Sequence, residues 1–307
     1  MKYSVEKTEF HTDGFDSRFY APRTGSERCL VIVTDSGSGD FMNVMLAKWA
    51  LRNGCCALCF GKWQNPEEAD GLHEWPLERM ERAAAWLQER GMRRIGLLGV
   101  SYGANLVLAA ASRIPAFTLT IAVTAIDFVT EGVVAGKKEG MSEWPAGVSS
   151  YTWRGEPLAY HPFSLSEHAY YDLFVESSKR EREPRSFEIY RHMEEKAPAP
   201  ECYIPVERIQ GKLILAAARD DSMWDAARYA QRMRERLAAS DCSCEYEVCI
   251  YRYGTHFLFP QSALQKVLPL VGGLLPALTR SGRRHGRECR ESRKELEHTL
   301  LEALHRW

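Results

Sequence analysis

The sequence lacks any apolar run long enough to cross a bilayer. A membrane-spanning helix needs about 20 consecutive, mostly apolar residues, and no stretch of this chain of 307 residues approaches that length. Residues 1–9 also lack the apolar segment of a signal peptide, so we expect no secretory leader. The sequence therefore predicts a cytoplasmic protein without a membrane span.

An excess of positive charge is also missing. The chain has 40 Lys and Arg residues against 41 Asp and Glu residues, which gives a formal net charge of −1 at pH 7. Proteins that bind nucleic acid usually carry a basic excess, so we expect no nucleic-acid partner. The length allows one large α/β domain or two small ones.

The nine cysteines form no pattern that indicates a metal site or a disulfide framework. Their number is odd, so they cannot all pair with one another. Cys55, Cys56 and Cys59 lie in an apolar run that is typical of a buried strand, and no second pair follows at zinc-finger spacing. We interpret the cysteines as buried free thiols in a reducing compartment, and we expect neither a metal nor another cofactor.

The strongest motif lies in residues 94–112. Ile95–Val100 is an apolar run of strand length, and Leu106–Ala111 consists of strong helix formers. Between them stands a G-x-S-x-G motif with Ser101 at its centre. In a nucleophile elbow the serine occupies a strained turn, and the glycines leave room where strand and helix cross. We predict that Ser101 is a nucleophile. An incidental serine in a glycine-rich turn is the alternative.

Strands and helices alternate along most of the chain. The expected strands are Cys29–Thr34, Cys55–Phe60, Ile95–Val100, Thr118–Ile126, Gly211–Ala218 and Cys244–Tyr253, and the expected helices are Phe41–Arg52, Leu77–Arg90, Leu106–Ala111, Trp224–Leu237 and Glu291–Trp307. Residues 3–20 alternate around Asp13-Gly14, which predicts an antiparallel edge hairpin with a two-residue turn. Leu296, Leu300 and Leu304 share one face of the last helix, which we expect to pack on the sheet. The pattern predicts an α/β fold with a mostly parallel, doubly wound sheet.

Residues 128–200 interrupt this alternation between two expected strands. The segment is rich in aromatic residues: Trp144, Tyr151, Trp153, Tyr160, Phe163, Tyr170, Tyr171, Phe174, Phe187 and Tyr190. An aromatic-rich insertion at this point predicts a lid over an apolar pocket. The alternative is an ordinary packed segment that does not gate a site. We expect a single domain over residues 1–307, with residues 128–200 as the lid or cap insertion.

A serine nucleophile needs a base, and the base needs an acid that orients it. Such groups commonly follow one another as serine, acid and histidine on loops at the carboxyl ends of strands. Asp220 and Asp221 follow one expected strand, and His256 follows the last one. We predict His256 as the general base and Asp221 as the acid, because Asp221 stands further from the strand end. Asp220 and Asp127 remain alternatives for the acid.

An oxyanion hole needs two preorganised N–H donors. We expect one from the backbone of Tyr102 and the other from Gly37 or Ser38, in a Gly- and Ser-rich turn after a strand. A phosphate-binding loop there is a weaker alternative, because the turn lacks the Lys-Ser/Thr of a P-loop and the G-x-G-x-x-G spacing. The predicted reaction is hydrolytic acyl transfer through an acyl-enzyme on Ser101.

These motifs together resemble the α/β-hydrolase superfamily. Within it, the chain is most similar to the C-terminal catalytic domain shared by acyl-CoA thioesterases and bile-acid-CoA:amino acid N-acyltransferases. The resemblance covers most of residues 25–307 except the middle insertion, and rests on Ser36-Gly-Ser-Gly39, Pro76–Leu87, Ile95–Ala104, Ile204–Gly211, Asp220-Asp-Ser-Met-Trp224 and Tyr253-Gly-Thr-His256. It implies an α/β-hydrolase fold, Asp221 as the acid, and an acyl-CoA or another acyl ester as substrate. A serine nucleophile, as in the thioesterases, favours hydrolysis over transfer to an amine.

The sequence is compatible with three functions. The first is a thioesterase-like serine hydrolase, and the second is a carboxylesterase or dienelactone-hydrolase-like enzyme with the same three residues. The third is a catalytically silent α/β-hydrolase fold that binds a ligand. CoA recognition would need cations for its phosphates, for which Lys137, Lys138, Arg180 and Arg182 are candidates. The sequence leaves the oligomeric state open, a homo-oligomer included.

Overall fold

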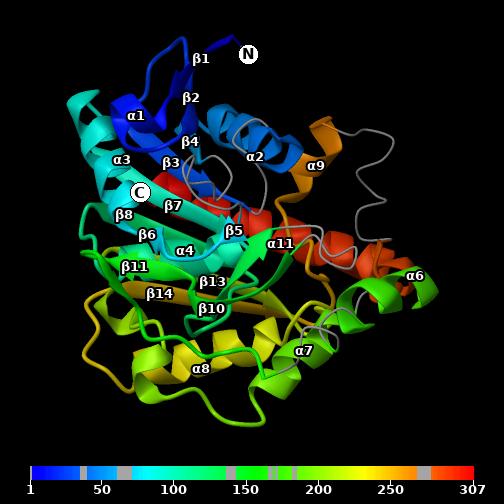
Figure 1. Cartoon of the computed structure of the whole chain (residues 1–307). Helices are drawn as coiled ribbons and strands as arrows, with labels where there is room; N and C mark the ends of the chain where they lie inside the picture. Colours follow the sequence, from blue (N-terminus) through cyan, green and yellow to red (C-terminus); the bar gives the residue numbers. More distant parts are fainter. Residues whose placement is uncertain are drawn as a thin grey trace.

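A long, mostly parallel sheet forms the centre of the molecule (Figure 1). The computed structural model describes residues 2–34, 40–60, 71–135, 143–164, 169, 172–181, 185–267 and 278–307. Within them, an eight-stranded sheet has the order β1-β2-β4-β3-β7-β8-β13-β14. Its strands are β1 (Tyr3–Thr8), β2 (Ser17–Pro22), β3 (Arg28–Val33), β4 (Cys56–Phe60), β7 (Arg94–Val100), β8 (Phe117–Val123), β13 (Lys212–Ala218) and β14 (Glu245–Tyr251). The strands from β4 to β14 run parallel, and β1 and β2 add an antiparallel pair at one edge. The predicted fold class is confirmed.

The turn of the N-terminal hairpin differs from the prediction. A short helix, α1 (Phe10–Asp13), replaces the expected two-residue turn between β1 and β2. The Asp13 carboxylate accepts a hydrogen bond from the Glu9 N–H at 2.9 Å, which stabilises a helical turn. Gly14 then ends this helix with a φ of 79°. The Asp-Gly pair therefore marks a helix end rather than a hairpin turn.

Helices cover both faces of the sheet because alternate strand residues point to opposite sides. In β3, Leu30 and Ile32 belong to one hydrophobic core, while Val31 and Val33 belong to the other. The first core is covered by α2 (Phe41–Arg52), α9 (Gln261–Val267) and α11 (Gly286–Arg306), and the second by α3 (Glu78–Glu89), α4 (Tyr102–Ala111) and α8 (Ala226–Ala238). This arrangement confirms the prediction of a doubly wound sheet.

The C-terminal helix α11 packs on the sheet as predicted, and it begins five residues earlier than the expected Glu291, at Gly286. Leu296, Leu300 and Leu304 are buried in the core on that face. At the end of the helix, the indole N–H of Trp307 donates to the hydroxyl of Thr118 at 2.7 Å. Among the described residues, every helix is too short or too polar to span a bilayer.

The described parts of residues 128–200 contribute strands to two small sheets and form several short helices. These elements are β9 (Glu131–Ala135), β10 (Glu143–Ser149), β11 (Tyr151–Trp153), β12 (Glu156–Pro157), a π-helical turn (Asp172–Glu176), α6 (Ser177–Glu181) and α7 (Ser186–Met193). β5 (Gly71–Leu72) pairs with β9, and β6 (Trp75–Pro76) pairs with β11. The segment is therefore joined to the chain before α3 by strand pairing. After it come 3-10 turns at Pro200–Cys202 and Val206–Arg208, and α10 (Arg280–Arg284) precedes α11.

Candidate active site

Ser101 lies in a sharp turn between β7 and α4. Its backbone has a φ of 60° and a ψ of −131°, a strained conformation for a residue with a side chain. The two flanking glycines allow the turn. A Cβ on Gly99 would overlap the backbone carbonyl of Gly103, and a Cβ on Gly103 would overlap that of Val33. The close crossing of strand and helix therefore requires glycine at both positions, as the motif predicts.

The structure brings Ser101, His256 and Asp221 together. The Nε2 atom of His256 lies 2.9 Å from the Ser101 hydroxyl oxygen. Its Nδ1 atom lies 2.8 Å and 3.0 Å from the two carboxylate oxygens of Asp221. A carboxylate only accepts hydrogen bonds, so Nδ1 carries the proton and Nε2 accepts from the serine hydroxyl. The arrangement leaves the imidazole ready to take a proton from Ser101.

Sheet topology explains why residues distant in the chain meet here. Ser101 follows β7, Asp221 follows β13 and His256 follows β14. The carboxyl ends of parallel strands lie at the same edge of a sheet, where ligand sites of open α/β sheets commonly form. All three side chains are buried, with 6 % of Ser101, 6 % of Asp221 and 8 % of His256 exposed. Burial in this setting strengthens the hydrogen bonds between them.

The two alternative acids have other partners. One oxygen of Asp220 accepts hydrogen bonds from the backbone N–H groups of Gly254 and Thr255, both at 2.8 Å. Asp127 accepts from the guanidinium of Arg232, with Nε at 2.8 Å. Burial raises the pKa of the Asp127 carboxyl, while the bonds from Arg232 act in the opposite direction. Of the three candidates, Asp221 is the one bonded to the imidazole.

The predicted oxyanion-hole donors are described only in part. Tyr102 is the first residue of α4, so its backbone stands at the positive end of the helix dipole beside Ser101. Gly37 and Ser38 lie outside the described residues. The same holds for Lys137, Lys138 and Arg182 among the candidate phosphate ligands, whereas Arg180 is exposed on α6.

An aromatic cluster beside the histidine was not predicted. Trp224 packs edge-on against His256 with ring centroids 4.8 Å apart, and its indole N–H donates to the Thr124 carbonyl at 2.9 Å. Tyr190 of α7 packs against Trp224 at 5.0 Å, and its hydroxyl is bonded to that of Tyr102. The sequence does contain a signal for Trp224, because this residue ends the Asp-Asp-Ser-Met-Trp run that also carries Asp221. No sequence signal separates Tyr190 from the other aromatic residues of the insertion.

The thiols contribute no cluster to the site. All nine cysteines are free, and seven of them are buried, which confirms the prediction of buried free thiols for most of the set. Burial raises the pKa of the Cys56 thiol to about 11. Within the part of the chain that the structure describes, no group of three or more His, Cys, Asp and Glu side chains could hold a metal ion.

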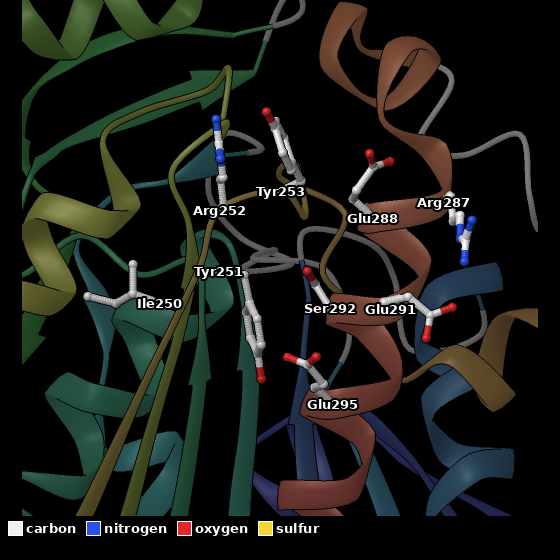
Figure 2. Close-up of a pocket in the computed structure, with 9 residues that line it drawn as sticks. All are labelled: Ile250, Tyr251, Arg252, Tyr253, Arg287, Glu288, Glu291, Ser292 and Glu295. Carbon is white, nitrogen blue, oxygen red and sulfur yellow. The ribbon is translucent and has the colours of Figure 1, made fainter.

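A separate groove of 580 Å³ lies outside the edge strand of the sheet (Figure 2). One wall is the end of β14 and the residues after it, Ile250 to Tyr253, and the other is the exposed face of α11 from Arg287 to Glu295. Figure 2 shows Tyr253 at one end of this groove. The chain continues from Tyr253 directly into the loop that carries His256.

A profile of the family described as BAAT / Acyl-CoA thioester hydrolase C terminal matches residues 75–263, a range that contains Ser101, Asp221 and His256. No curated protein matches the chain.

Solved structures of several hydrolases are similar to the chain. The esterase Pf2001 of Pyrococcus furiosus has a TM-score of 0.52 at 13 % identity, over 100 % of this chain and 93 % of that one. An acylaminoacyl peptidase of Pyrococcus horikoshii scores 0.51 at 12 %, over 98 % of this chain and 41 % of that one. A putative dienelactone hydrolase of Klebsiella pneumoniae scores 0.50 at 11 %, over 96 % and 97 %. At such identities the likeness shows the fold alone, an α/β-hydrolase fold.

Proposed function

The chain belongs to the BAAT / acyl-CoA thioester hydrolase C-terminal family, and from this premise we propose that it is a serine hydrolase that cleaves acyl thioesters or esters. Membership of this family and the α/β-hydrolase fold indicate a hydrolase of the esterase or thioesterase type. One observation carries the finer proposal. His256 bridges the Ser101 hydroxyl and the Asp221 carboxylate at 2.9 Å and 2.8 Å.

In the proposed mechanism, the Ser101 oxygen attacks the acyl carbonyl while Nε2 of His256 takes the hydroxyl proton. Asp221 stabilises the imidazolium that forms. The negative charge on the former carbonyl oxygen is held by the Tyr102 N–H and by an N–H of Gly37 or Ser38. The C–S or C–O bond then breaks, the imidazolium of His256 gives its proton to the leaving group, and an acyl-enzyme remains. The neutral His256 next deprotonates a water molecule that attacks the acyl-enzyme, and it returns this proton to the Ser101 oxygen as the free acid leaves.

The alternatives differ in substrate or in chemistry. A carboxylesterase or dienelactone-hydrolase-like enzyme would use the same three residues on an oxyester. A silent binding module has no need for a serine, an imidazole and a carboxylate in hydrogen-bonded sequence, so their arrangement favours an enzyme. We propose acyl-CoA as the first thioester to test, because the family description names acyl-CoA thioesters.

We further propose that residues 128–200 form a lid over the site within one domain of residues 1–307. The support is the contact of Tyr190 in α7 with both Tyr102 and Trp224. These two residues adjoin Ser101 and His256. The cytoplasmic location predicted from the sequence stays a prediction.

Labelling with a fluorophosphonate tests the nucleophile. Wild type should be labelled under native conditions, and Ser101→Ala should not be, with kcat/KM falling by about 10⁴-fold or more. Ser112→Ala is a matched control, since Ser112 is equally buried, 6 % exposed, at the end of the same helix. An unlabelled wild type would contradict the serine assignment. Turnover of p-nitrophenyl esters without turnover of acyl-CoAs would reject the thioesterase assignment and keep the hydrolase.

A further inference from the structure

The loop that carries His256 is held by a side chain. The loop begins after β14, and Thr255 in it has a φ of 58°, which is strained for a β-branched residue. Its N–H and that of Gly254 both donate to one carboxylate oxygen of Asp220 at 2.8 Å. Backbone N–H groups that bond to a carboxylate form strong, charge-assisted hydrogen bonds. Asp220 therefore fixes the backbone immediately before the histidine.

Two further contacts join the same loop to the C-terminal helices. The second carboxylate oxygen of Asp220 accepts a hydrogen bond from the Ser281 hydroxyl of α10 at 2.5 Å. The Tyr253 ring stacks on the His285 ring, with centroids 4.0 Å apart and planes 18° apart. Figure 2 shows Tyr253 where the groove beside β14 meets this loop. The loop is thus fixed on both sides, by Asp220 and by His285.

We propose that Asp220 is a positioning residue for the general base. It holds the loop so that the His256 ring lies between Ser101 and Asp221. The two adjacent carboxylates have different roles. Asp221 orients the ring of His256, and Asp220 orients the backbone that carries this ring. This inference rests on the proposed function, since it assigns Asp220 an effect that reaches Ser101 only through His256.

A double-mutant cycle with His256 separates positioning from general stabilisation of the fold. In the wild-type background, Asp220→Ala lowers kcat for a p-nitrophenyl ester by about 10²-fold, the loss typical of a catalytic group displaced by about 1 Å. KM changes by less than about 3-fold, since both carboxylate oxygens of Asp220 are bonded within the protein. In a His256→Ala background, Asp220→Ala changes the residual activity by less than about 2-fold.

The conservative variant tests the geometry. Asp220→Asn keeps a carbonyl oxygen for the two N–H groups and an amide N–H for Ser281, so it restores activity to within about 10-fold of wild type. Asp225→Ala is a matched control. Asp225 lies in the same segment, but it caps α8 by accepting from the Arg228 N–H at 3.1 Å. This control should leave kcat unchanged in both backgrounds.

Two outcomes would overturn the inference. The first is an equal loss of kcat from Asp220→Ala in both backgrounds, and the second is an unchanged kcat in the wild-type background. If the Asp220→Ala protein does not fold, Asp220→Asn replaces it in the cycle. That variant must then lower kcat by about 3- to 10-fold in wild type alone, and an equal effect in both backgrounds contradicts positioning. Failure of the proposed function is recognised separately, because wild type would then not react with a fluorophosphonate.

Discussion

The nucleophile side and the base side of the site are held in place by different means. Ser101 is fixed by backbone crowding, because α4 passes β7 at Gly99 and the end of β3 at Val33 without room for a Cβ. The His256 ring is fixed by hydrogen bonds to Asp221, and the backbone before it is fixed by hydrogen bonds to Asp220 on the same loop as Asp221. The first arrangement is steric, and the second is electrostatic. Substitutions on the nucleophile side should therefore lower the free energy of unfolding, and substitutions on the base side should lower kcat.

Asp221→Asn should have the largest effect on the base side. An amide at this position favours the wrong tautomer of His256, in which Nε2 carries the proton and cannot accept from Ser101. We expect kcat to fall by about 10⁴-fold, with a melting temperature close to that of wild type. Steady-state kinetics and a thermal melt measure both. Asp220→Asn at the neighbouring position is the matched control. A similar loss of kcat in both variants would contradict the different roles assigned to Asp220 and Asp221.

Gly103→Ala should damage the nucleophile side through the fold. The added Cβ would overlap the backbone carbonyl of Val33, and overpacking of this kind costs about 1–3 kcal/mol of the free energy of unfolding. Chemical denaturation measures the change. Gly286→Ala is the control, because a Cβ there meets no atom within 4 Å. A Gly103→Ala protein as stable as wild type would show that crowding does not define the turn.

The pKa of the Cys289 thiol tests the charge of Asp220, and we expect this effect to be smaller than those of Asp221→Asn and Gly103→Ala. Burial and the negative charge of Asp220 raise the pKa of the Cys289 thiol to about 11. At pH 9 only about 10⁻² of it is therefore thiolate. Asp220→Asn removes the charge, so the pKa of the Cys289 thiol falls and its thiolate fraction at pH 9 rises a few-fold.

NMR of protein labelled with ¹³C at the cysteine β-carbons follows the titration of each thiol. Cys56 is the internal control, since its pKa is also about 11 and Asp220 is not among the causes of its shift. The pKa of Cys56 should be equal in both proteins. An unchanged pKa of Cys289 as well would mean that the Asp220 carboxylate does not act on this part of the molecule.

The same contrast explains how much the sequence could predict. The strands and helices around Ser101 follow from short-range patterns, and the structure has them within a few residues of the expected bounds. Asp13-Gly14 misled because the Asp13 side chain bonds back to Glu9 and starts a helical turn. Local propensity alone does not reveal this competition between two short structures.

The base side could be predicted only as a set of candidates. Asp220 and Asp221 both follow β13, and Asp220 lies in a turn, where strand alternation does not decide the direction of a side chain. Which of them reaches the imidazole depends on the loop after β14, which lies far away in the sequence. The position further from the strand end and the family resemblance both favoured Asp221, but neither excluded Asp220. The contact of Tyr190 with Tyr102 depends on the course of a long insertion, for which the sequence has no periodic pattern.

The length of α11 has a consequence for the whole molecule. It spans 21 residues, or about 32 Å at 1.5 Å per residue, and runs across the width of the molecule in Figure 1. Trp307, which follows its last residue, is bonded to Thr118 at the start of β8, while its first turn adjoins His285, which stacks on Tyr253. One continuous helix thus connects opposite edges of the sheet, and one of its two ends adjoins the loop that carries His256.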